Sequence, residues 1–579
     1  MDYKLEYNKW LQDPYFDEHT KKELSNLQEN EIKERFYKEL EFGTAGLRGI
    51  FAAGTNRINK YTIRKATQGF ANFINKQKKD TQKQGVAIAY DSRYMSYELA
   101  VETAQVLSAN GIKSYLFKEI TATPILSFAV RYLNCVGGIV ITASHNPPEY
   151  NGYKVYLEDG GQLTPPRDAE IIQEVKQVKE YEAIQTLEIE EAKKRSLVQE
   201  IGESIYDAYM SELKQYIMNK EVIQKEKSNI KIVYTPLYGT GNKPVRRILK
   251  EVGFENVFVV KEQESPDHRF PTAKYPNPED EKVYALAKSL AIKNDADIIF
   301  ATDPDADRIG VLIKHNDQYI PLSGNMLGIL MTHYIITQKK ENNELPTNGI
   351  LLKTIVSTKM MNKIAKENNI KLMEVLTGFK YIGEKIKEFE EQKTYQYLFG
   401  FEESYGYLYG TAIRDKDGIL STMLLCEILA YYKSRHMNLW DAMIQLYNTY
   451  GYYLEKQESI TFEGIHGIKN MDVIMNTLRK SMINYIGKYK VIKVKDYLKQ
   501  EIKEVATQKT EETLLPKSNV LYYELENDTW FAIRPSGTEP KMKLYFGVKG
   551  NSLNQAKEEM NYIIDYVMGI IEKIKYTIK

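Results

Sequence analysis

Short apolar runs alternate with amphipathic stretches over the first two-thirds of the chain. The runs are rich in β-branched residues and only four to eight residues long, which is typical of buried strands; they include "GVAIAY" (85–90), "GGIVITA" (137–143), "NIKIVY" (229–234) and "ADIIFATD" (296–303). Stretches with helical periodicity separate them, such as 96–111, 243–253 and 279–293. Strands separated by helices of this length predict βαβ units and mostly parallel sheets.

The last part of the chain has a different pattern. Residues 518–550, "SNVLYYELENDTWFAIRPSGTEPKMKLYFGVKG", alternate between strand and turn without helices between them. Residues 554–574 then form an amphipathic helical pattern. We therefore expect a distinct C-terminal domain of α+β type. The lysine-rich stretch 175–195 predicts a solvated helical connection near a domain boundary.

Composition indicates an ordinary soluble globular protein of several domains. At about 150 residues per domain, 579 residues correspond to roughly four domains. The chain is 43% hydrophobic and 27% charged. Its 79 basic and 78 acidic residues leave a net charge of +1, so no overall field recruits nucleic acid or an anionic membrane. We expect neither as a partner, although a local basic pocket is compatible with this balance.

Three further features bear on location and redox chemistry. The N-terminus is charged and lacks the apolar core of a signal peptide. The longest apolar stretch, 418–432, is too short and too polar to span a bilayer. The two cysteines, Cys135 and Cys426, lie in apolar contexts and predict buried thiols rather than a disulfide or zinc site. We expect a cytoplasmic protein.

The loop "ATDPDADRIG" places Asp303, Asp305 and Asp307 directly after a predicted strand. On a straight strand alternate side chains stand about 6.5–7 Å apart, too far to share a small cation. Pro304 favours a curled loop in which the three carboxylates converge, and hard oxygen ligands of this kind suit Mg²⁺. An EF-hand is excluded, because Arg308 and Lys314 stand where it needs glycine and glutamate. A simple helix cap is disfavoured, because "RIGVLI" reads as a strand.

Two glycine-containing turns carry donors suited to phosphate. The turn "RPSGTEPKMK" lies between two β runs, and it offers Arg534, Ser536, Gly537, Thr538 and Lys543. On residue types alone an ordinary surface turn explains it equally well. The turn "GTAGLRG" (43–49) adds Arg48.

Other loops exclude some ligands and suggest one. The loop "GFEESYGY" (400–407) contains Glu402, Glu403 and Ser404. These side chains can contact sugar hydroxyls, or they can belong to an ordinary loop that binds nothing. "TGFKYIGEK" fails as a P-loop at Glu384, and "YGTGNKP" lacks the last glycine of a dinucleotide fingerprint.

Ser144 stands at the end of a strand in "GGIVITASHNPPEYNGYKVY" (137–156). A Ser-His-Asp hydrolase is disfavoured, because the chain has no GxSxG elbow there. On an extended backbone the adjacent His145 would point away from Ser144. A serine accompanied by a Mg²⁺ loop and arginine-bearing phosphate turns suggests instead that its hydroxyl carries a phosphoryl group.

Together these motifs resemble the α-D-phosphohexomutase family, the phosphoglucomutases and their relatives. "TASHNPPEYNGYKVY" is similar to the family's phosphoserine loop and "DPDADR" to its metal loop. "GFEESYGY" is similar to its sugar-specificity loop and "RPSGTEPK" to its phosphate-binding loop. The four motifs occur in family order, and the match spans nearly the whole chain, closest to a long bacterial subgroup of phosphoglucomutase-like and phosphopentomutase-like members.

The resemblance implies an α/β fold of four domains around a central cleft. Three related α/β domains would have mixed, largely parallel sheets, and the smaller C-terminal domain would be α+β. Domain 1 would span 1–215 with an N-terminal helical extension and the phosphoserine loop, and domain 2 would span 216–312 with the metal loop. Domain 3 would span 313–445 with the sugar loop, and domain 4 would span 446–579 with the phosphate loop.

The resemblance also implies an isomerase, an intramolecular phosphotransferase. It would interconvert glucose 1-phosphate and glucose 6-phosphate through phosphorylated Ser144 and a glucose 1,6-bisphosphate intermediate, which would also act as activator. Mg²⁺ would be held by Asp303, Asp305, Asp307 and a phosphoserine oxygen. Sugar phosphates would be its ligands, and the protein would be a monomer or dimer.

The remaining roles are carried over residue by residue. Arg48 and Lys154 would stabilise the charge in transfer, with His145 beside them, and Lys154 and Lys416 are both candidates for acid–base catalysis. The substrate-binding set would be Asn146, Arg308, Lys380, Glu402, Ser404, Arg534, Ser536, Gly537, Thr538 and Lys543.

Departures from the family pattern bear on the substrate. The phosphomannomutase-type loop reads "GEMSGH", whereas this chain reads "GFEESYGY", so a mannose preference loses support. The Glu-Glu-Ser core favours glucose, but the flanking aromatic residues and "FGTAGLRG" resemble members with phosphopentomutase activity. Phosphoglucomutase is the first choice, with phosphopentomutase or phosphomannomutase as alternatives. A bisphosphate synthase with another phosphoryl donor and a non-catalytic sugar-phosphate-binding scaffold are the remote ones.

Overall fold

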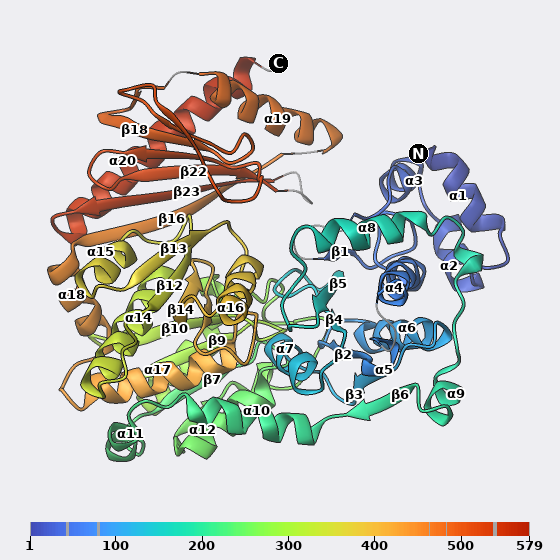
Figure 1. The fold of residues 1–579 in the computed structure, drawn as a ribbon, viewed down its shortest axis with the longest axis horizontal. Coiled ribbons are helices and arrows are strands. Elements are labelled where there is room, and N and C mark those ends of the chain that lie inside the picture. Colours follow the sequence, from blue (N-terminus) through green and yellow to red (C-terminus); the bar gives the residue numbers. More distant parts are fainter. Residues whose placement is uncertain are drawn as a thin grey trace. The chain divides into compact units, whose positions relative to one another are not determined.

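The computed structural model describes residues 2–41, 46–77, 81–462, 464–481, 483–536 and 541–577. The chain divides into two compact units. Their helices and strands are labelled in Figure 1. The first unit comprises residues 1–323, 379–397 and 404–438, and the second unit comprises 324–378, 398–403 and 439–579.

The first sheet of the first unit has the strand order β1-β5-β4-β2-β3-β6. Its strands are β1 (Leu47–Ile50), β2 (Val86–Tyr90), β3 (Ser114–Phe117), β4 (Gly137–Ile141), β5 (Tyr150–Leu157) and β6 (Val198–Ile201). β2 pairs in parallel with β3 and β4, whereas β5 runs antiparallel to β4 and β1. Every residue of β2 and β4 is buried, as expected for parallel strands covered on both faces.

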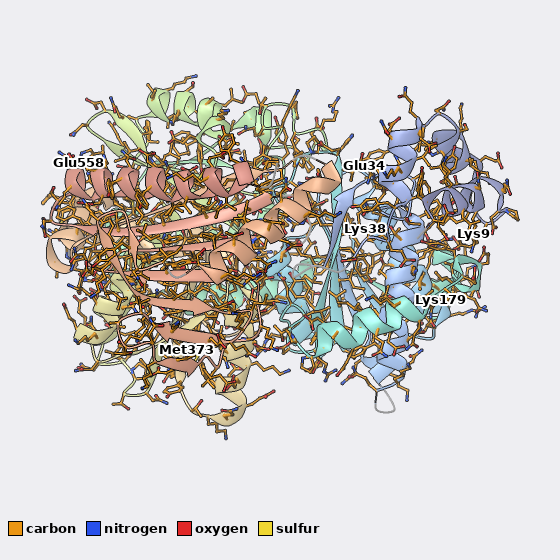
Figure 2. The ribbon with its side chains drawn as sticks, turned by 90° about the horizontal axis from the view of Figure 1, so that it is seen from above. Lys9, Glu34, Lys38, Lys179, Met373 and Glu558 are labelled. Carbon is orange, nitrogen blue, oxygen red and sulfur yellow. The ribbon has the colours of Figure 1, made fainter. Side chains whose placement is uncertain are left out.

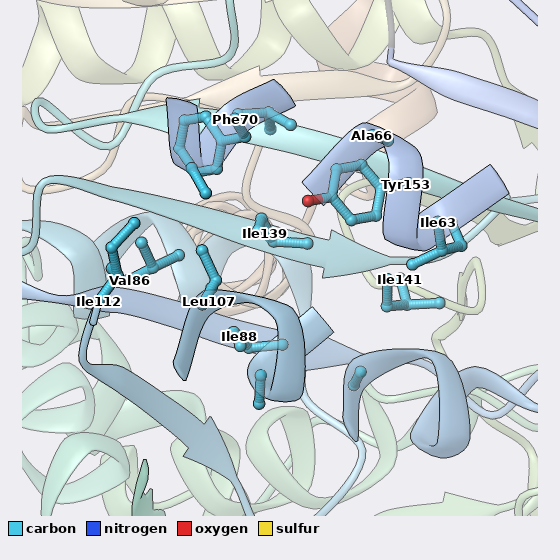
Figure 3. Packing of buried hydrophobic residues seen from close by; sticks show 14 of the residues in the cluster. Ile63, Ala66, Phe70, Val86, Ile88, Leu107, Ile112, Ile139, Ile141 and Tyr153 are labelled. Carbon is cyan, nitrogen blue, oxygen red and sulfur yellow. The ribbon is translucent and has the colours of Figure 1, made fainter. Parts of the chain in front are cut away.

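Helices from both sides of the first sheet build its core. The helices of this region are α4 (Lys60–Asn75), α5 (Thr81–Gln84), α6 (Ser96–Ala109), α7 (Thr123–Tyr132) and α8 (Arg167–Gln177). Figure 3 shows the core on one face of the sheet, where Phe70 of α4 and Leu107 of α6 lie with Ile88 and Ile139, all fully or almost fully buried. α7 packs on the opposite face, against β2 and β4. This packing fixes the strand ends that carry the candidate site.

The N-terminal helical extension packs around one tryptophan. It consists of α1 (Tyr3–Gln12), α2 (Glu18–Ser25) and α3 (Glu29–Phe36). Trp10 is fully buried and stacks on Phe16, with Phe36 and Tyr61 against its edges. Figure 2 shows Lys9 of α1 near the turn carrying Lys179, where its Nζ donates to Glu180 Oε2 at 2.6 Å. The predicted helical extension is present.

The lysine-rich connection is less helical than predicted. It contains the end of α8, a 3₁₀ turn η1 (Tyr181–Ala183) and the short helix α9 (Ile189–Lys194). The chain then returns to the first sheet as β6 before α10 (Glu203–Gln215) and α11 (Lys220–Glu226) begin.

The second sheet, also in the first unit, has the order β11-β10-β9-β7-β8. Its elements are β7 (Ile232–Thr235), α12 (Asn242–Val252), β8 (Val257–Val259), η2 (Lys261–Gln263), η3 (Glu281–Tyr284), α13 (Ala285–Asn294), β9 (Ile298–Thr302), β10 (Ile309–His315) and β11 (Gln318–Leu322). β7 pairs in parallel with β8 and β9, and β10 is antiparallel to β9. The alternating strands and helices predicted from the sequence are thus present.

The third α/β region follows. β13 (Lys371–Val375), β12 (Gly349–Thr354) and β14 (Gln396–Glu402) are neighbours in this order, and β12 and β13 are parallel. The other elements are α14 (Gly324–Glu341), α15 (Met360–Glu367), α16 (Lys380–Gln392), β15 (Gly406–Leu408), α17 (Gly418–Lys433) and α18 (Leu439–Tyr450).

The C-terminal region is β-rich, as predicted. Its main sheet has the order β16-β23-β22-β21-β18-β19-β20, and β17 pairs with β18. The elements are β16 (Tyr452–Thr461), α19 (Gly464–Lys480), β17 (Tyr485–Ile486), β18 (Tyr489–Asp496), β19 (Glu501–Glu504), β20 (Thr510–Glu512), β21 (Leu521–Leu525), β22 (Trp530–Pro535), β23 (Lys541–Gly550) and α20 (Leu553–Thr577). The meander β21-β22-β23 followed by α20 matches the pattern predicted for 518–574.

One predicted domain boundary deserves adjustment. A boundary after residue 312 would cut β10, which pairs with both β9 and β11 in one sheet. We therefore propose a boundary after Leu322, and the boundaries after 215 and 445 stay predictions.

Candidate active site

Ser144 follows the central strand β4 and is almost completely buried. Its backbone is left-handed, with φ 50°. The Ser144 amide donates to Thr142 Oγ1 at 2.8 Å, and Ser144 Oγ donates to Asp303 Oδ2 at 2.7 Å. The strand end therefore aims the hydroxyl of Ser144 at the aspartate loop.

His145 does not point away from Ser144, as alternation on an extended backbone predicted. Its Nδ1 lies 3.0 Å from Ser144 Oγ. The prediction was wrong because Ser144 is left-handed, and adjacent side chains alternate only on an extended backbone. The ring of His145 also packs edge-on against Tyr275, with the centroids 5.9 Å apart.

The three aspartates converge, as the curled loop between β9 and β10 predicted. Ala306 in this loop has φ 53°, which turns the chain back. Ligand oxygens of Asp303, Asp305 and Asp307 lie within 4.8 Å of one another, and all three side chains are buried. Within the described ranges this is the only group of acidic, histidine or cysteine side chains so arranged.

Two lysines face these carboxylates. Lys154 of β5 donates to Asp305 Oδ2 at 2.8 Å and lies 3.6 Å from Asp307 Oδ2. Lys416 Nζ lies 3.1 Å from Asp307 Oδ2. Burial and the neighbouring carboxylates raise the pKa of Asp303, whereas for Asp305 the penalty of burial is outweighed by Lys154 and the pKa is lowered. The pKa of Lys154 is raised, because Asp305 and Asp307 outweigh its burial.

The donor set fits a divalent cation. Asp305 Oδ1 and Asp307 Oδ1 are buried without a hydrogen-bond partner among the described residues, and such groups are costly unless something binds them. Three carboxylates that offer hard oxygen ligands match the preference of Mg²⁺. The geometry is therefore compatible with a Mg²⁺ ion, and the roles of the aspartates as ligands stay a prediction.

Lys416 is held by a buried network that begins at Asp415. Asp415 Oδ1 accepts from the Lys416 amide at 2.8 Å and from its Nζ at 3.2 Å. Asp415 Oδ2 accepts from Tyr156 at 2.7 Å and from Gln162 at 2.6 Å. This network orients Lys416 toward the aspartate loop.

The start of α17 comes close to the same loop. The Gly418 amide donates to Ala306 O at 3.2 Å, and a Cβ on Gly418 would meet this oxygen and Arg308 O at 2.8 Å each. Only glycine allows this approach, which brings Lys416, two residues earlier, next to the carboxylates.

Arg48, Asn146 and Arg308 are further predicted site residues of the first unit. Arg48 Nη1, from β1, donates to Asn146 Oδ1 at 3.1 Å. The Arg308 amide donates to Asp303 Oδ1 at 3.1 Å, and its Nη1 donates to Glu279 at 2.8 Å. Lys380 begins α16, and its Nζ lies 3.9 Å from Asp168. Burial lowers the pKa of Lys380.

Other predicted residues belong to the second unit. Glu402 is buried at the end of β14, and its neighbour Glu403 accepts from Thr354 Oγ1 at 2.8 Å. Arg534 Nη1 donates to Thr377 Oγ1 at 2.5 Å, and Lys543 stands opposite Arg534 in the β22–β23 pair. The Ser536 amide donates to Lys541 O at 2.7 Å.

Some predicted positions can be placed less fully. Ser404 lies in the first unit and is partly exposed. Gly537 and Thr538, and residues 43–45 of the "GTAGLRG" turn, lie outside the described residues.

Sequence reasoning missed the residues that position the predicted site residues through hydrogen bonds. Asp91 and Arg93 follow β2 and contact the Ser144 loop, and Thr123 Oγ1 donates to Asp305 Oδ2 at 3.0 Å. Asp415 and Tyr156 orient Lys416. The available signal was the charged "DSR" (91–93), which directly follows the apolar run "GVAIAY".

The chain matches three consecutive profiles of known proteins. They are described as phosphoglucomutase/phosphomannomutase, alpha/beta/alpha domains I, II and III, and they match residues 39–182, 207–316 and 323–450. The chain belongs to the phosphoglucomutase/phosphomannomutase family. This confirms the family and the α/β fold class predicted from the sequence.

Similar members of this family come from staphylococci. The chain is 37% identical over 545 residues to a phosphoglucomutase of Staphylococcus haemolyticus, covering 93% of this chain and 95% of that one. It is 36% identical over 541 residues to a phosphoglucomutase of Staphylococcus aureus strain MRSA252, with coverage of 93% and 95%. The predicted class of enzyme, an isomerase and phosphotransferase of phosphoglucomutase type, is therefore confirmed.

Solved structures share the family fold. The open form of pp63/parafusin, a phosphoglucomutase from Paramecium, matches with a TM-score of 0.68 at 17% identity, covering 93% of this chain and 96% of that one. A phosphoglucomutase/phosphomannomutase family protein from Burkholderia thailandensis matches with a TM-score of 0.65 at 18% identity, covering 92% and 97%. In the part of the chain that the structure describes, no helix has both the length and the apolar character needed to cross a membrane.

Proposed function

We propose that the enzyme interconverts glucose 1-phosphate and glucose 6-phosphate, with Ser144 as the carrier of the phosphoryl group. The contact between Ser144 Oγ and Asp303 Oδ2, 2.7 Å, carries this proposal, because it places a hydroxyl against a buried three-carboxylate group. A phosphoryl carrier needs neutralising charge on several sides, and Lys154 and Lys416 lie against the same carboxylates.

Mg²⁺ would be held by Asp303, Asp305 and Asp307 together with an oxygen of phosphorylated Ser144. When bound, the ion neutralises charge on the phosphoryl group and orients it for in-line transfer. Lys154 and Lys416 lie against the same carboxylates, so their ammonium groups would add positive charge beside the phosphoryl group. Arg48 and His145 would complete this charge around Ser144.

In the forward half-reaction, a sugar hydroxyl attacks the phosphorus on Ser144. The bond from phosphorus to Ser144 Oγ breaks, a bond to the sugar oxygen forms, the sugar hydroxyl loses its proton and Ser144 Oγ gains one. Lys154 and Lys416 are the candidates for moving this proton: one donates from its ammonium group, and the one that accepts does so as a neutral amine. The product is glucose 1,6-bisphosphate, which also primes unphosphorylated enzyme. The return of its other phosphoryl group to Ser144 gives the isomer and restores the carrier.

The sugar and its distal phosphate would be held by the remaining predicted residues. Glu402 and Ser404 would accept hydrogen bonds from sugar hydroxyls, and Asn146, Arg308 and Lys380 would bind near the reacting phosphate. Arg534, Ser536, Gly537, Thr538 and Lys543 would bind the phosphate that does not react. A cytoplasmic location, a monomeric or dimeric state and the absence of nucleic-acid or membrane partners stay predictions.

The test is a comparison of kcat/KM for glucose 1-phosphate, mannose 1-phosphate and ribose 1-phosphate with the purified enzyme, primed with the matching bisphosphate. We expect glucose 1-phosphate to be preferred by at least about tenfold, which corresponds to about 1.4 kcal/mol of transition-state binding. A preference for ribose 1-phosphate would replace the proposal by phosphopentomutase, and a preference for mannose 1-phosphate would replace it by phosphomannomutase. Turnover of none of the three would overturn it.

A further inference from the structure

Arg93 binds the backbone of the loop that carries Ser144. It follows β2, and its side chain is 0% exposed. Its Nη2 donates to Ser144 O at 2.6 Å and to Asn146 O. Its Nη1 donates to Pro147 O at 2.7 Å and to Tyr150 O at 3.0 Å. One guanidinium thus donates hydrogen bonds to four carbonyl oxygens within the seven residues 144–150.

These contacts depend on the shape of arginine. The guanidinium is planar and presents its donors in a fixed fork, whereas a lysine ammonium is a compact point charge. Without the fork, carbonyl oxygens in a closed space would lose their donors, and the loop would move to satisfy them. Arg93 therefore sets the path of the chain from residue 144 to residue 150.

A second contact holds the amide side of Ser144. Asp91 Oδ2 accepts from Thr142 Oγ1 at 2.7 Å, and Thr142 Oγ1 accepts from the Ser144 amide at 2.8 Å. Asp91 Oδ2 also lies 3.3 Å from Arg93 Nε. Both peptide groups that flank the Ser144 Cα are thus tied to the same Asp91–Arg93 pair.

The backbone of Ser144 needs this support. A non-glycine residue in the left-handed region costs free energy and persists only where its surroundings hold it there. Phe270 covers the guanidinium, with its ring centroid 5.1 Å from the central carbon of Arg93, and is itself fully buried. The guanidinium itself is thereby shielded from water.

We propose that Arg93 is a positioning residue for phosphoryl transfer, because its hydrogen bonds hold Ser144 in the left-handed conformation that aims Oγ at Asp303. Thr142 acts with it through the Ser144 amide. The inference rests on the proposed function, in which Ser144 carries the phosphoryl group. It extends that function to residues that do not touch the substrate.

The experiment measures the single-turnover rate of phosphoryl transfer from phosphorylated enzyme to glucose 1-phosphate, together with KM and the thermal midpoint. The variants are Arg93→Lys, Thr142→Val and the conservative Thr142→Ser. The controls are Arg57→Lys, a buried arginine that binds Asn56 O and Glu34, and Thr103→Val, whose hydroxyl bonds Leu99 O within α6. Ser144→Ala is run beside them.

We expect Arg93→Lys to lower the transfer rate by about 100-fold, as a displacement of about 1 Å at the reacting atom does, with KM changed by less than about threefold. Thr142→Val should lose at least about tenfold, while Thr142→Ser and both controls stay within about threefold. If Arg93→Lys does not fold, the comparison of Thr142→Val with Thr142→Ser tests the inference.

Two results would overturn the inference: transfer rates of Arg93→Lys and Thr142→Val within threefold of wild type, or losses that vanish when rates are expressed per folded molecule. Normal turnover by Ser144→Ala would instead overturn the proposed function itself. The two failures are therefore distinguishable.

Discussion

At the scale of single residues, the backbone conformation of Ser144 decides which atoms meet in the site. With φ 50°, Ser144 turns its hydroxyl toward Asp303 and brings His145 Nδ1 to 3.0 Å from the same oxygen. An extended serine would separate these groups. The hydroxyl therefore lies at the edge of the three carboxylates.

The same geometry predicts that Asp305 is needed for Mg²⁺ binding. Its Oδ1 is buried without a hydrogen-bond partner, and asparagine offers only one weaker oxygen ligand in its place. We expect Asp305→Asn to weaken Mg²⁺ binding by at least about tenfold, and to abolish most of the rise in thermal midpoint that saturating Mg²⁺ gives the wild type.

Titration calorimetry with Mg²⁺ and thermal unfolding with and without the ion check this prediction without an activity assay. Asp295→Asn is the matched control, since Asp295 is an exposed aspartate of the same domain that pairs with Lys314. Equal Mg²⁺ affinity in Asp305→Asn and wild type would contradict the assignment.

Sequence reasoning at this scale found residue types but not their supports. The three aspartates and Pro304 were enough to predict a converging loop, because their spacing excludes a shared site on a straight strand. The side of Ser144 on which His145 lies could not be predicted, because it depends on a left-handed residue that is not glycine. Arg93 was missed because its partners are backbone oxygens. Every residue has such an oxygen, so residue types do not identify these partners.

At the scale of elements, the candidate site residues are positioned by the ends of three strands and by the beginning of one helix. β2 ends before Asp91 and Arg93, β4 ends before Ser144, and β9 ends before Asp303. α17 begins at Gly418, directly after Lys416 and Asp417. These ends are where polar side chains of α/β folds are free to converge.

The cap of α17 predicts a dependence of stability on pH. The Asp417 carboxylate accepts from the Ile419 and Leu420 amides and from Tyr209, and burial raises its pKa to about 6. The folded protein then holds this proton more tightly than the unfolded chain does, so this group makes stability fall as pH rises from about 4 to about 6. Two pKa units correspond to about 3 kcal/mol.

Asp417→Asn should remove this loss, because an amide oxygen can cap the helix but does not ionise. We expect the thermal midpoint of the variant, relative to wild type, to rise as pH goes from about 4 to about 7. Asp2→Asn serves as control, since Asp2 caps α1 at an exposed position. A thermal midpoint of Asp417→Asn that falls relative to wild type over the same pH range would show that the sign is wrong.

At the scale of the whole molecule, the hydrophobic periodicity of the sequence predicted the fold class better than it predicted the domain boundaries. Strands such as β4 and β9 are buried throughout because helices cover both sheet faces, and the largely apolar runs that result can be recognised without a structure. A boundary after residue 312 would cut β10, because β10 and β11 form an antiparallel hairpin that extends the second sheet, and we propose a boundary after Leu322 instead. The two strands of a hairpin are joined by a short turn, so no helical stretch in the sequence marks where the sheet ends.

The central claim is that Ser144 carries the phosphoryl group between the two sugar phosphates. The most direct measurement treats the enzyme with glucose 1,6-bisphosphate, removes free sugar, and follows the mass of intact protein and of the peptide containing Ser144 before and after addition of glucose 1-phosphate. The account predicts a gain of one phosphoryl group on Ser144 and its loss to the sugar within one turnover, with neither change in Ser144→Ala. A phosphoryl group on another residue, or near-normal mutase turnover by Ser144→Ala, would contradict it.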